Sequence, residues 1–131
     1  GKSFSLLPVE IFYRETGKTK KVTEYPCDGK LLKAAEQVKT KYHTGRGVIG
    51  SGDEWNNQLD RIALLRERYH TAVEDMESAA AAQLCLSYGV PFLGVRILSN
   101  SIVNGEKFDE AVGIDGQKFM LSLVDQMREY M

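Results

Sequence analysis

The chain has 131 residues, of which 43% are hydrophobic, enough apolar material for the core of a single domain. Seventeen Lys and Arg residues stand against eighteen Asp and Glu residues, which leaves a net charge of −1. This charge creates no sequence-wide field that would hold a phosphate backbone or an anionic membrane. We therefore expect neither a nucleic acid nor a membrane as a partner, and no stretch approaches the roughly 20 apolar residues that span a bilayer.

The cysteine pattern and the first residues indicate the compartment. Cys27 and Cys85 lie far apart and have no second Cys or nearby His at metal-ligand spacing, so neither a disulfide framework nor a zinc site is indicated. The first apolar run is broken by Pro8 and Glu10 and is too short for the core of a signal peptide. We expect a reducing, cytoplasmic location and no metal or other cofactor.

Strand and helix patterns alternate along the sequence. Residues 6–13 and 22–25 are rich in strand formers on either side of Gly17 and predict a hairpin. The apolar spacing predicts, in order, a helix over 28–42, a short strand at 48–49, a helix over 59–68, a strand at 72–73, a helix over 78–88, a strand over 90–98, a polar loop over 101–112 and a C-terminal helix through 119–127. This order predicts an α/β fold with a mixed, largely parallel sheet flanked by helices.

Polar residues follow each of the three apolar strands, in the segments 51–56, 74–78 and 99–104. Ligands in open α/β sheets gather outside the carboxyl ends of the strands. The first segment offers the only tryptophan, Trp55, and the last offers Ser99 and Asn100, whose hydroxyl and amide present donors and acceptors to a heteroaromatic edge. The sequence therefore places a candidate site where these segments meet.

The middle segment is acidic, because Glu74, Asp75 and Glu77 put three carboxylates within four residues. Two interpretations stay open. The carboxylates either favour the dipole of the following helix and face water, or they are partly buried and need a partner to offset the cost of desolvation. Met76, an apolar residue between acids, indicates that alternate residues point to different environments.

The stretches 48–53, 72–80 and 90–100 together resemble the purine/uridine nucleoside phosphorylase and nucleosidase family, with the nearest likeness to its methylthioadenosine/S-adenosylhomocysteine nucleosidase branch. The likeness runs from about residue 28 to the end and covers only the C-terminal half of the family. It implies that residues 1–131 form one partial domain with the C-terminal half of a nucleoside phosphorylase-like fold. The missing half would carry the first strands, the glycine-rich phosphate or water region, and the Glu that orients the attacking water.

The resemblance also implies roles for single residues. Glu77 would bind the ribose hydroxyls, and a carboxylate suits this role because it accepts two hydrogen bonds from a cis-diol. Met76 would line the sugar pocket, Asp75 matches a further acid near the sugar, and Trp55 would stack on the base. If phosphate is the attacking group, Arg96 is a candidate phosphate ligand, but it precedes the end of its predicted strand and is otherwise a paired structural arginine. His43 and His70, near helix ends, are expected at the surface.

Asn100 is the main departure from the family. The nucleosidase branch has at this position an Asp that protonates purine N7, and an amide cannot act as a general acid. Losing such a donor typically lowers the rate about 10²- to 10⁴-fold, although an amide still holds a base by hydrogen bonds.

Three functions stay open on these grounds. The first is cleavage of the N-glycosidic bond of a purine nucleoside or thionucleoside, with Glu77 and Asn100 as the residues nearest the reaction. The others are phosphorolysis of a nucleoside, and noncatalytic nucleoside binding or storage. The resemblance implies a small-molecule nucleoside as ligand, and either a homo-oligomer or association with the missing N-terminal half.

Overall fold

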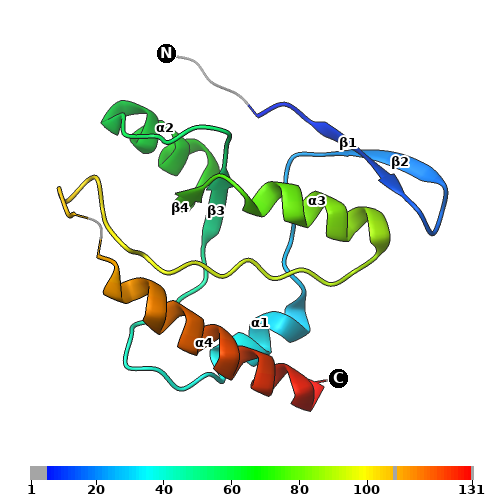
Figure 1. Cartoon of the computed structure of the whole chain (residues 1–131). Helices are drawn as coiled ribbons and strands as arrows, with labels where there is room; N and C mark the ends of the chain where they lie inside the picture. Colours follow the sequence, from blue (N-terminus) through cyan, green and yellow to red (C-terminus); the bar gives the residue numbers. More distant parts are fainter. Residues whose placement is uncertain (1–5, 108, 131) are drawn as a thin grey trace.

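The computed structural model describes residues 6–107 and 109–130. Its elements are, in chain order, β1 (Val9–Tyr13), β2 (Lys18–Val22), α1 (Gly29–Glu36), β3 (Val48–Ser51), α2 (Leu59–Tyr69), β4 (Thr71–Asp75), α3 (Ser78–Tyr88), α4 (Ala111–Met127) and the short 3₁₀ helix η1 (Arg128–Tyr130). In Figure 1, β3 and β4 lie near the centre, with α2 above them, α3 to their right, and α1 and α4 below. The predicted α/β class is confirmed.

The β1–β2 hairpin is antiparallel, with Val9 opposite Val22. Gly17 adopts a φ of +67°, which favours glycine, and its N–H donates to Tyr13 O at 2.9 Å. Because this turn is tight, pairing resumes at Lys18, so the returning strand is 18–22 and the prediction of 22–25 was wrong. The hairpin is fastened to α3 by the hydrogen bond that Ser87 Oγ donates to Phe12 O at 2.6 Å.

Strands β3 and β4 are parallel and are joined by the α2 crossover. Ser51 pairs with Asp75 at their carboxyl ends. The described residues therefore form two separate two-stranded sheets, one antiparallel and one parallel, so the strands are mixed as predicted but "largely parallel" describes them only loosely.

The first and last helices differ in extent from their predictions. Asp28 caps α1 by accepting from Lys30 N at 2.9 Å and Leu31 N at 3.0 Å, but the helix ends at Glu36 and not near residue 42. Its end tightens through short-range bonds, of which Val38 N to Ala35 O at 3.2 Å is the last. Helix α4 begins at Ala111, inside the predicted loop 101–112, where Asp109 Oδ1 accepts from Ala111 N at 3.0 Å. No helix in the described ranges is long and apolar enough to cross a membrane.

The main core cluster lies between α1 and α4. Ala34, Val38 and Leu123 are at most 8% exposed and form its centre. The partly buried residues packed around them are Ala35, Leu93, Val95, Phe119 and Met127. Two of these residues, Leu93 and Val95, belong to the run 90–98, so this connection contributes to the core.

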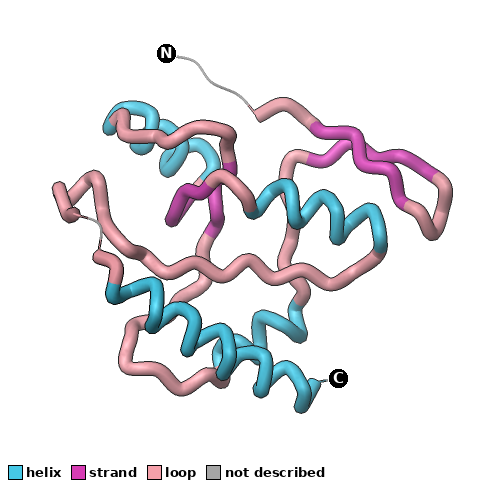
Figure 2. Tube along the Cα trace, viewed as in Figure 1, coloured by secondary structure: helices cyan, strands magenta, loops and turns pink. Residues whose placement is uncertain are grey.

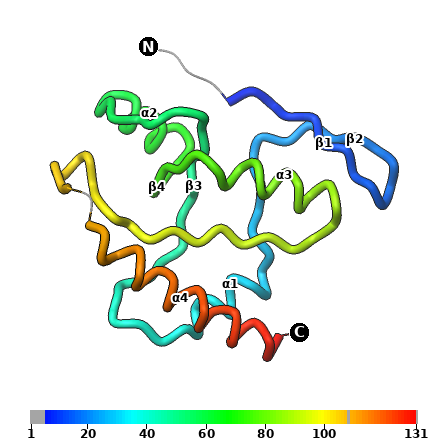
Figure 3. Tube along the Cα trace, in the orientation of Figure 1, coloured from blue at the N-terminus to red at the C-terminus, as the bar shows by residue number. Residues whose placement is uncertain are grey.

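Residues 90–98 were predicted as a strand, and this prediction was wrong: the run has no strand partner among the described residues. Figure 2 shows it as a long stretched-out connection, and in Figure 3 it crosses between α3 and α4. A strand requires a ladder of backbone hydrogen bonds to a neighbour in register. The nearest approach to one is the bond from Asp28 N to Phe92 O at 2.7 Å.

Candidate functional site at the ends of the parallel strands

The carboxyl ends of β3 and β4 lie side by side. Ser51 and Asp75 are paired in the ladder, and Gly52 N donates to Asp75 O at 3.0 Å just beyond it. Helix α3 begins at Ser78, three residues after Asp75. The prediction that the polar segments 51–56 and 74–78 meet at one edge of the sheet is therefore confirmed.

Asp75 is the centre of a hydrogen-bonded network at this edge. Its side chain is only 8% exposed. Oδ1 accepts from the backbone N–H groups of Glu77 at 3.3 Å and Ser78 at 3.2 Å, which satisfies free donors at the start of α3. Oδ2 accepts from the Ser78 hydroxyl and from Arg96 Nε at 2.5 Å. The network joins β4, α3 and the run 90–98.

The environment keeps Asp75 ionised. Burial raises the pKa of its carboxyl group, but hydrogen bonds from Ser78, Ser51 and Arg96 lower it by more, so the pKa lies below the ordinary value for aspartate. Ser51 Oγ also accepts from Ala79 N at 3.1 Å and so ties β3 to α3. Asp75 is therefore a fixed anion at neutral pH and not a proton donor.

Arg96 is held on several sides. Besides its ion pair with Asp75, its NH2 group donates to Ser78 Oγ at 2.8 Å and its NH1 group to Val95 O at 2.9 Å. The same NH2 group lies 3.8 Å from Glu77 Oε2. Of the two interpretations of this residue, the paired structural arginine is the one that the structure supports.

Glu77 differs sharply from Asp75, because its side chain is 71% exposed. Its Oε2 accepts from Met76 N at 3.3 Å and lies 3.8 Å from Arg96 NH2. The two interpretations of the acidic turn thus hold for different residues: Asp75 is buried and paired, whereas Glu77 is open to solvent. The predicted alternation of environments holds from exposed Glu74 through half-buried Asp75 to Met76, which is 45% exposed, and it ends at Glu77, which is exposed as well.

Trp55 lies on the loop between β3 and α2 and is 65% exposed. The next residue, Asn56, donates from Nδ2 to Glu74 Oε1 at 2.9 Å and Oε2 at 3.2 Å, which fastens the loop to β4. On the other side, Glu54 pairs with Arg61 at the start of α2. The loop is thus anchored on both sides of Trp55, and within the described ranges no hydrogen bond joins its indole to Glu77.

Ser99 and Asn100 are half-buried and bonded to each other, with Ser99 Oγ donating to Asn100 Oδ1 at 3.1 Å. They follow Arg96 by three and four residues. The structure therefore connects Asp75, Glu77 and Arg96 directly and brings the Trp55 loop to β4, while it leaves the Ser99–Asn100 pair outside the network.

The sequence did not predict that Ser51 and Ser78 donate hydrogen bonds to Asp75. The signal for Ser78 is its position three residues after an Asp, the spacing of a helix cap. The histidines behave as predicted, since His43 and His70 are both exposed.

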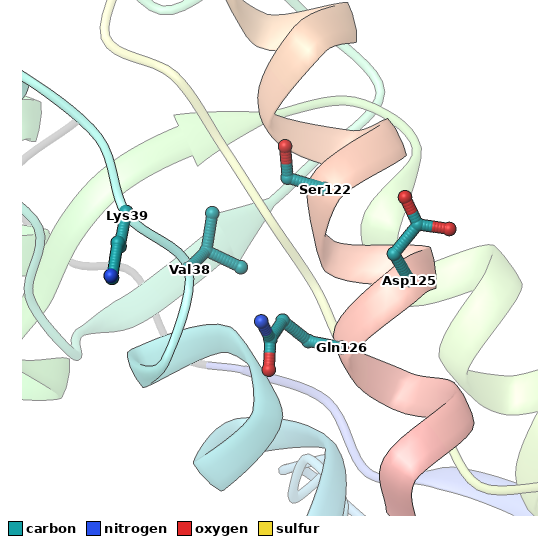
Figure 4. A pocket seen from close by; sticks show the side chains of 5 residues that line it. All are labelled: Val38, Lys39, Ser122, Asp125 and Gln126. Atoms are coloured by element: carbon teal, nitrogen blue, oxygen red, sulfur yellow. The ribbon is translucent and has the colours of Figure 1, made fainter.

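A cavity of about 370 Å³ lies elsewhere, between the end of α1 and α4 (Figure 4). It is lined by Val38, Lys39, Ser122, Asp125 and Gln126. None of the candidate site residues lines it. The described residues also contain no group of three or more His, Cys, Asp or Glu that would hold a metal ion.

The chain is an α/β protein whose polar side chains lie at the exits of paired parallel strands, the position where open α/β sheets bind small ligands. The chain belongs to the phosphorylase superfamily, whose family model matches residues 7–127. The match includes the β1–β2 hairpin, although the likeness read from the sequence began only at about residue 28.

Several relatives carry the name 5'-methylthioadenosine/S-adenosylhomocysteine nucleosidase. The protein of Bacillus pumilus is 34% identical over 129 residues, covering 90% of this chain and 55% of the relative. That of Aeromonas salmonicida is 32% identical over 121 residues (87% and 53%), and that of Geobacillus kaustophilus 30% over 114 residues (80% and 48%). The chain thus spans about half the length of the curated relatives it matches.

Proposed function

We propose that this chain takes part in cleaving the N-glycosidic bond of a purine nucleoside or thionucleoside. The observation that carries the proposal is the position of Glu77, an exposed carboxylate at the shared exit of β3 and β4, beside a fixed guanidinium. Membership of the phosphorylase superfamily and the names of the nucleosidase relatives support the same substrate class.

In this proposal Glu77 accepts hydrogen bonds from the two ribose hydroxyls, a geometry that suits a carboxylate. Asp75 and Arg96 keep the backbone around Glu77 in place, and Met76 packs against the sugar. As the bond to the base breaks, the sugar gains oxocarbenium-like positive charge, which the exposed carboxylate of Glu77 stabilises. Trp55 stacks on the base after the loop closes over the ligand.

The leaving base takes the electron pair of the broken bond and needs a proton. Asn100 cannot supply it, because an amide is not a general acid. We assign to Asn100 and Ser99 the binding of the base by hydrogen bonds. Proton delivery from solvent would make cleavage slow.

The attacking group is water in this proposal. Phosphorolysis is less favoured, because Asp75, Ser78 and Val95 already accept from all three nitrogens of Arg96 and leave one N–H group on each terminal nitrogen for a phosphate. A noncatalytic nucleoside-binding protein is the second candidate, and Asn100 is the residue that favours it.

We further propose that residues 1–131 act as one partial domain in the cytoplasm. In this view the site is completed by association, either with a polypeptide equivalent to the unmatched part of the relatives or with further copies of the chain. Large apolar side chains that remain exposed, among them Leu84, Leu98 and Leu121, support association with one of these two partners.

The test is release of free base from a panel of purine nucleosides and thionucleosides, with and without phosphate. The chain is assayed alone and together with the unmatched part of the Bacillus pumilus relative, with Glu77→Gln as the matched control. Base released without phosphate, and lost in Glu77→Gln, supports hydrolysis; release that requires phosphate supports phosphorolysis. Saturable binding without release supports the binding protein, and neither binding nor release contradicts all three.

A further inference from the structure

The loop that follows β3 is fixed to β4 at two points. Gly52 N donates to Asp75 O at 3.0 Å, directly beyond the strand ladder. Four residues later, Asn56 Nδ2 donates to both carboxylate oxygens of Glu74, at 2.9 and 3.2 Å. The two acceptors are consecutive residues of β4, so the segment 53–55 forms a short loop that is closed at both ends over the exit of this strand.

The side-chain amide of Asn56 is bound at both of its ends. While Nδ2 donates to Glu74, Oδ1 accepts from Gln58 N at 3.2 Å, just before α2 begins. The amide nitrogen only donates and the amide oxygen only accepts, so these two partners fix the orientation of the group. Asn56 therefore joins β4 to the start of α2, and it is half-buried where it does so.

Strand β3 leaves room for the Glu74 side chain. Gly50 pairs with Glu74 in the ladder, and a Cβ added to Gly50 would lie 3.5 Å from Glu74 Cγ. The aliphatic part of Glu74 thus lies beside a residue that has no side chain. Because alternate residues of a strand point to opposite faces, Glu74 reaches the loop while its neighbour Asp75 reaches Arg96.

We propose that Asn56 and Glu74 are positioning residues for a bound base. Trp55 is 65% exposed, so packing holds little of the indole in place, whereas the contact of Asn56 with Glu74 fixes the residue next to it. Only the segment 53–55 then has to be ordered when Trp55 closes over a ligand, which limits the entropic cost of binding. The proposal rests on the proposed function, which places the base at Trp55 and the ribose at Glu77.

A reversed pair of side chains tests the contact. Asn56→Asp removes the donor and sets a second carboxylate against Glu74, but it keeps an oxygen for Gln58 N. Adding Glu74→Gln to this variant restores one donor and one acceptor of the same lengths with the direction reversed. Asn57→Asp is the matched control, because Asn57 is exposed and has no hydrogen bond to Glu74 in the described part of the chain.

The first measurement is the fluorescence anisotropy decay of Trp55, the only tryptophan, in the full chain without ligand. We expect a larger loss of anisotropy within the first nanoseconds in Asn56→Asp, because the indole gains local motion. The reversed pair and Asn57→Asp should behave as the parent chain does, with equal helical circular dichroism in all four proteins. An unchanged decay in Asn56→Asp, or a reversed pair that does not restore it, overturns the proposal.

The second measurement is the affinity for methylthioadenosine by equilibrium dialysis, with the chain and the unmatched part of the Bacillus pumilus relative together and with that part alone as a blank. We expect binding to be at least about fivefold weaker in Asn56→Asp and to recover in the reversed pair, because a further residue must be ordered when the contact is missing. A more mobile indole with unchanged affinity overturns the role toward the base. Absence of binding in the parent contradicts the proposed function and that role together, whereas the anisotropy decay shows separately whether the pair holds Trp55.

Discussion

Arg96 Nε lies 2.5 Å from Asp75 Oδ2, so an arginine 21 positions further along the chain closes the end of β4. This ion pair is the link that brings the run 90–98 to the strand ends without a backbone ladder. It also places a guanidinium 3.8 Å from Glu77 Oε2. The position of Glu77 therefore depends on a side chain that the sequence alone does not assign to it.

Replacing Asp75 with Asn should destabilise the chain by about 2 kcal/mol. The amide keeps the shape but removes the charge that binds Arg96, and hydrogen bonds to charged groups contribute about 1.5–3 kcal/mol. Urea unfolding measures the change. Glu77→Gln is the control, because its exposed side chain should alter stability by less than about 0.5 kcal/mol. Equal effects of the two variants would show that the network does not stabilise the fold.

The stability of the chain should depend on pH through Asp75. Because the folded pKa of Asp75 lies below its ordinary value of about 3.9, its contribution is present above that value and is lost as the pH falls toward the folded pKa. We expect the free energy of unfolding to fall more steeply below about pH 4 in the parent chain than in Asp75→Asn. Other carboxylates contribute equally to both, so parallel curves would contradict the assignment.

Replacing Asn100 with Asp supplies a carboxyl group at the position where the proposed function places the base. If the missing proton donor limits cleavage, base release should rise by about 10²- to 10⁴-fold in this variant. Asn100→Ala is the control, because it removes the amide without adding an acid. Unchanged release in Asn100→Asp, with nucleoside binding intact, would favour the noncatalytic binding protein.

Local patterns predicted much of the fold. The Asp28 cap, the α2 crossover and the α3 helix with its terminal Gly89 follow from short-range rules of capping and periodicity, and the structure confirms them. The strand at 90–98 was wrong for a different reason. A near-continuous apolar run indicates that a segment is buried on both faces, but a ladder depends on a neighbour elsewhere in the chain or in a partner.

The sequence predicted which polar segments meet at the strand ends better than it predicted their side-chain contacts. The meeting of residues 51–56 with 74–78 follows from the rule for parallel strands. The pairing of Arg96 with Asp75, and the bond from Asn56 to Glu74, are long-range side-chain contacts that no sequence spacing encodes. The contact with Arg96 distinguishes buried Asp75 from exposed Glu77, which the sequence of the acidic turn alone does not.

The central claim is that Glu77 and Trp55 share one nucleoside, and the intrinsic fluorescence of the chain tests it most directly, because Trp55 is the only tryptophan. The chain, alone and with the unmatched part of the Bacillus pumilus relative, is titrated with methylthioadenosine. The unmatched part of the relative is also titrated alone, so that any fluorescence change of its own can be subtracted. We expect saturable quenching as the base stacks on the indole, and an affinity at least about tenfold lower in Glu77→Gln, since the hydrogen bonds to the charged carboxylate are lost. Fluorescence that stays constant while the nucleoside binds, or equal affinities of the parent and Glu77→Gln, would contradict the account.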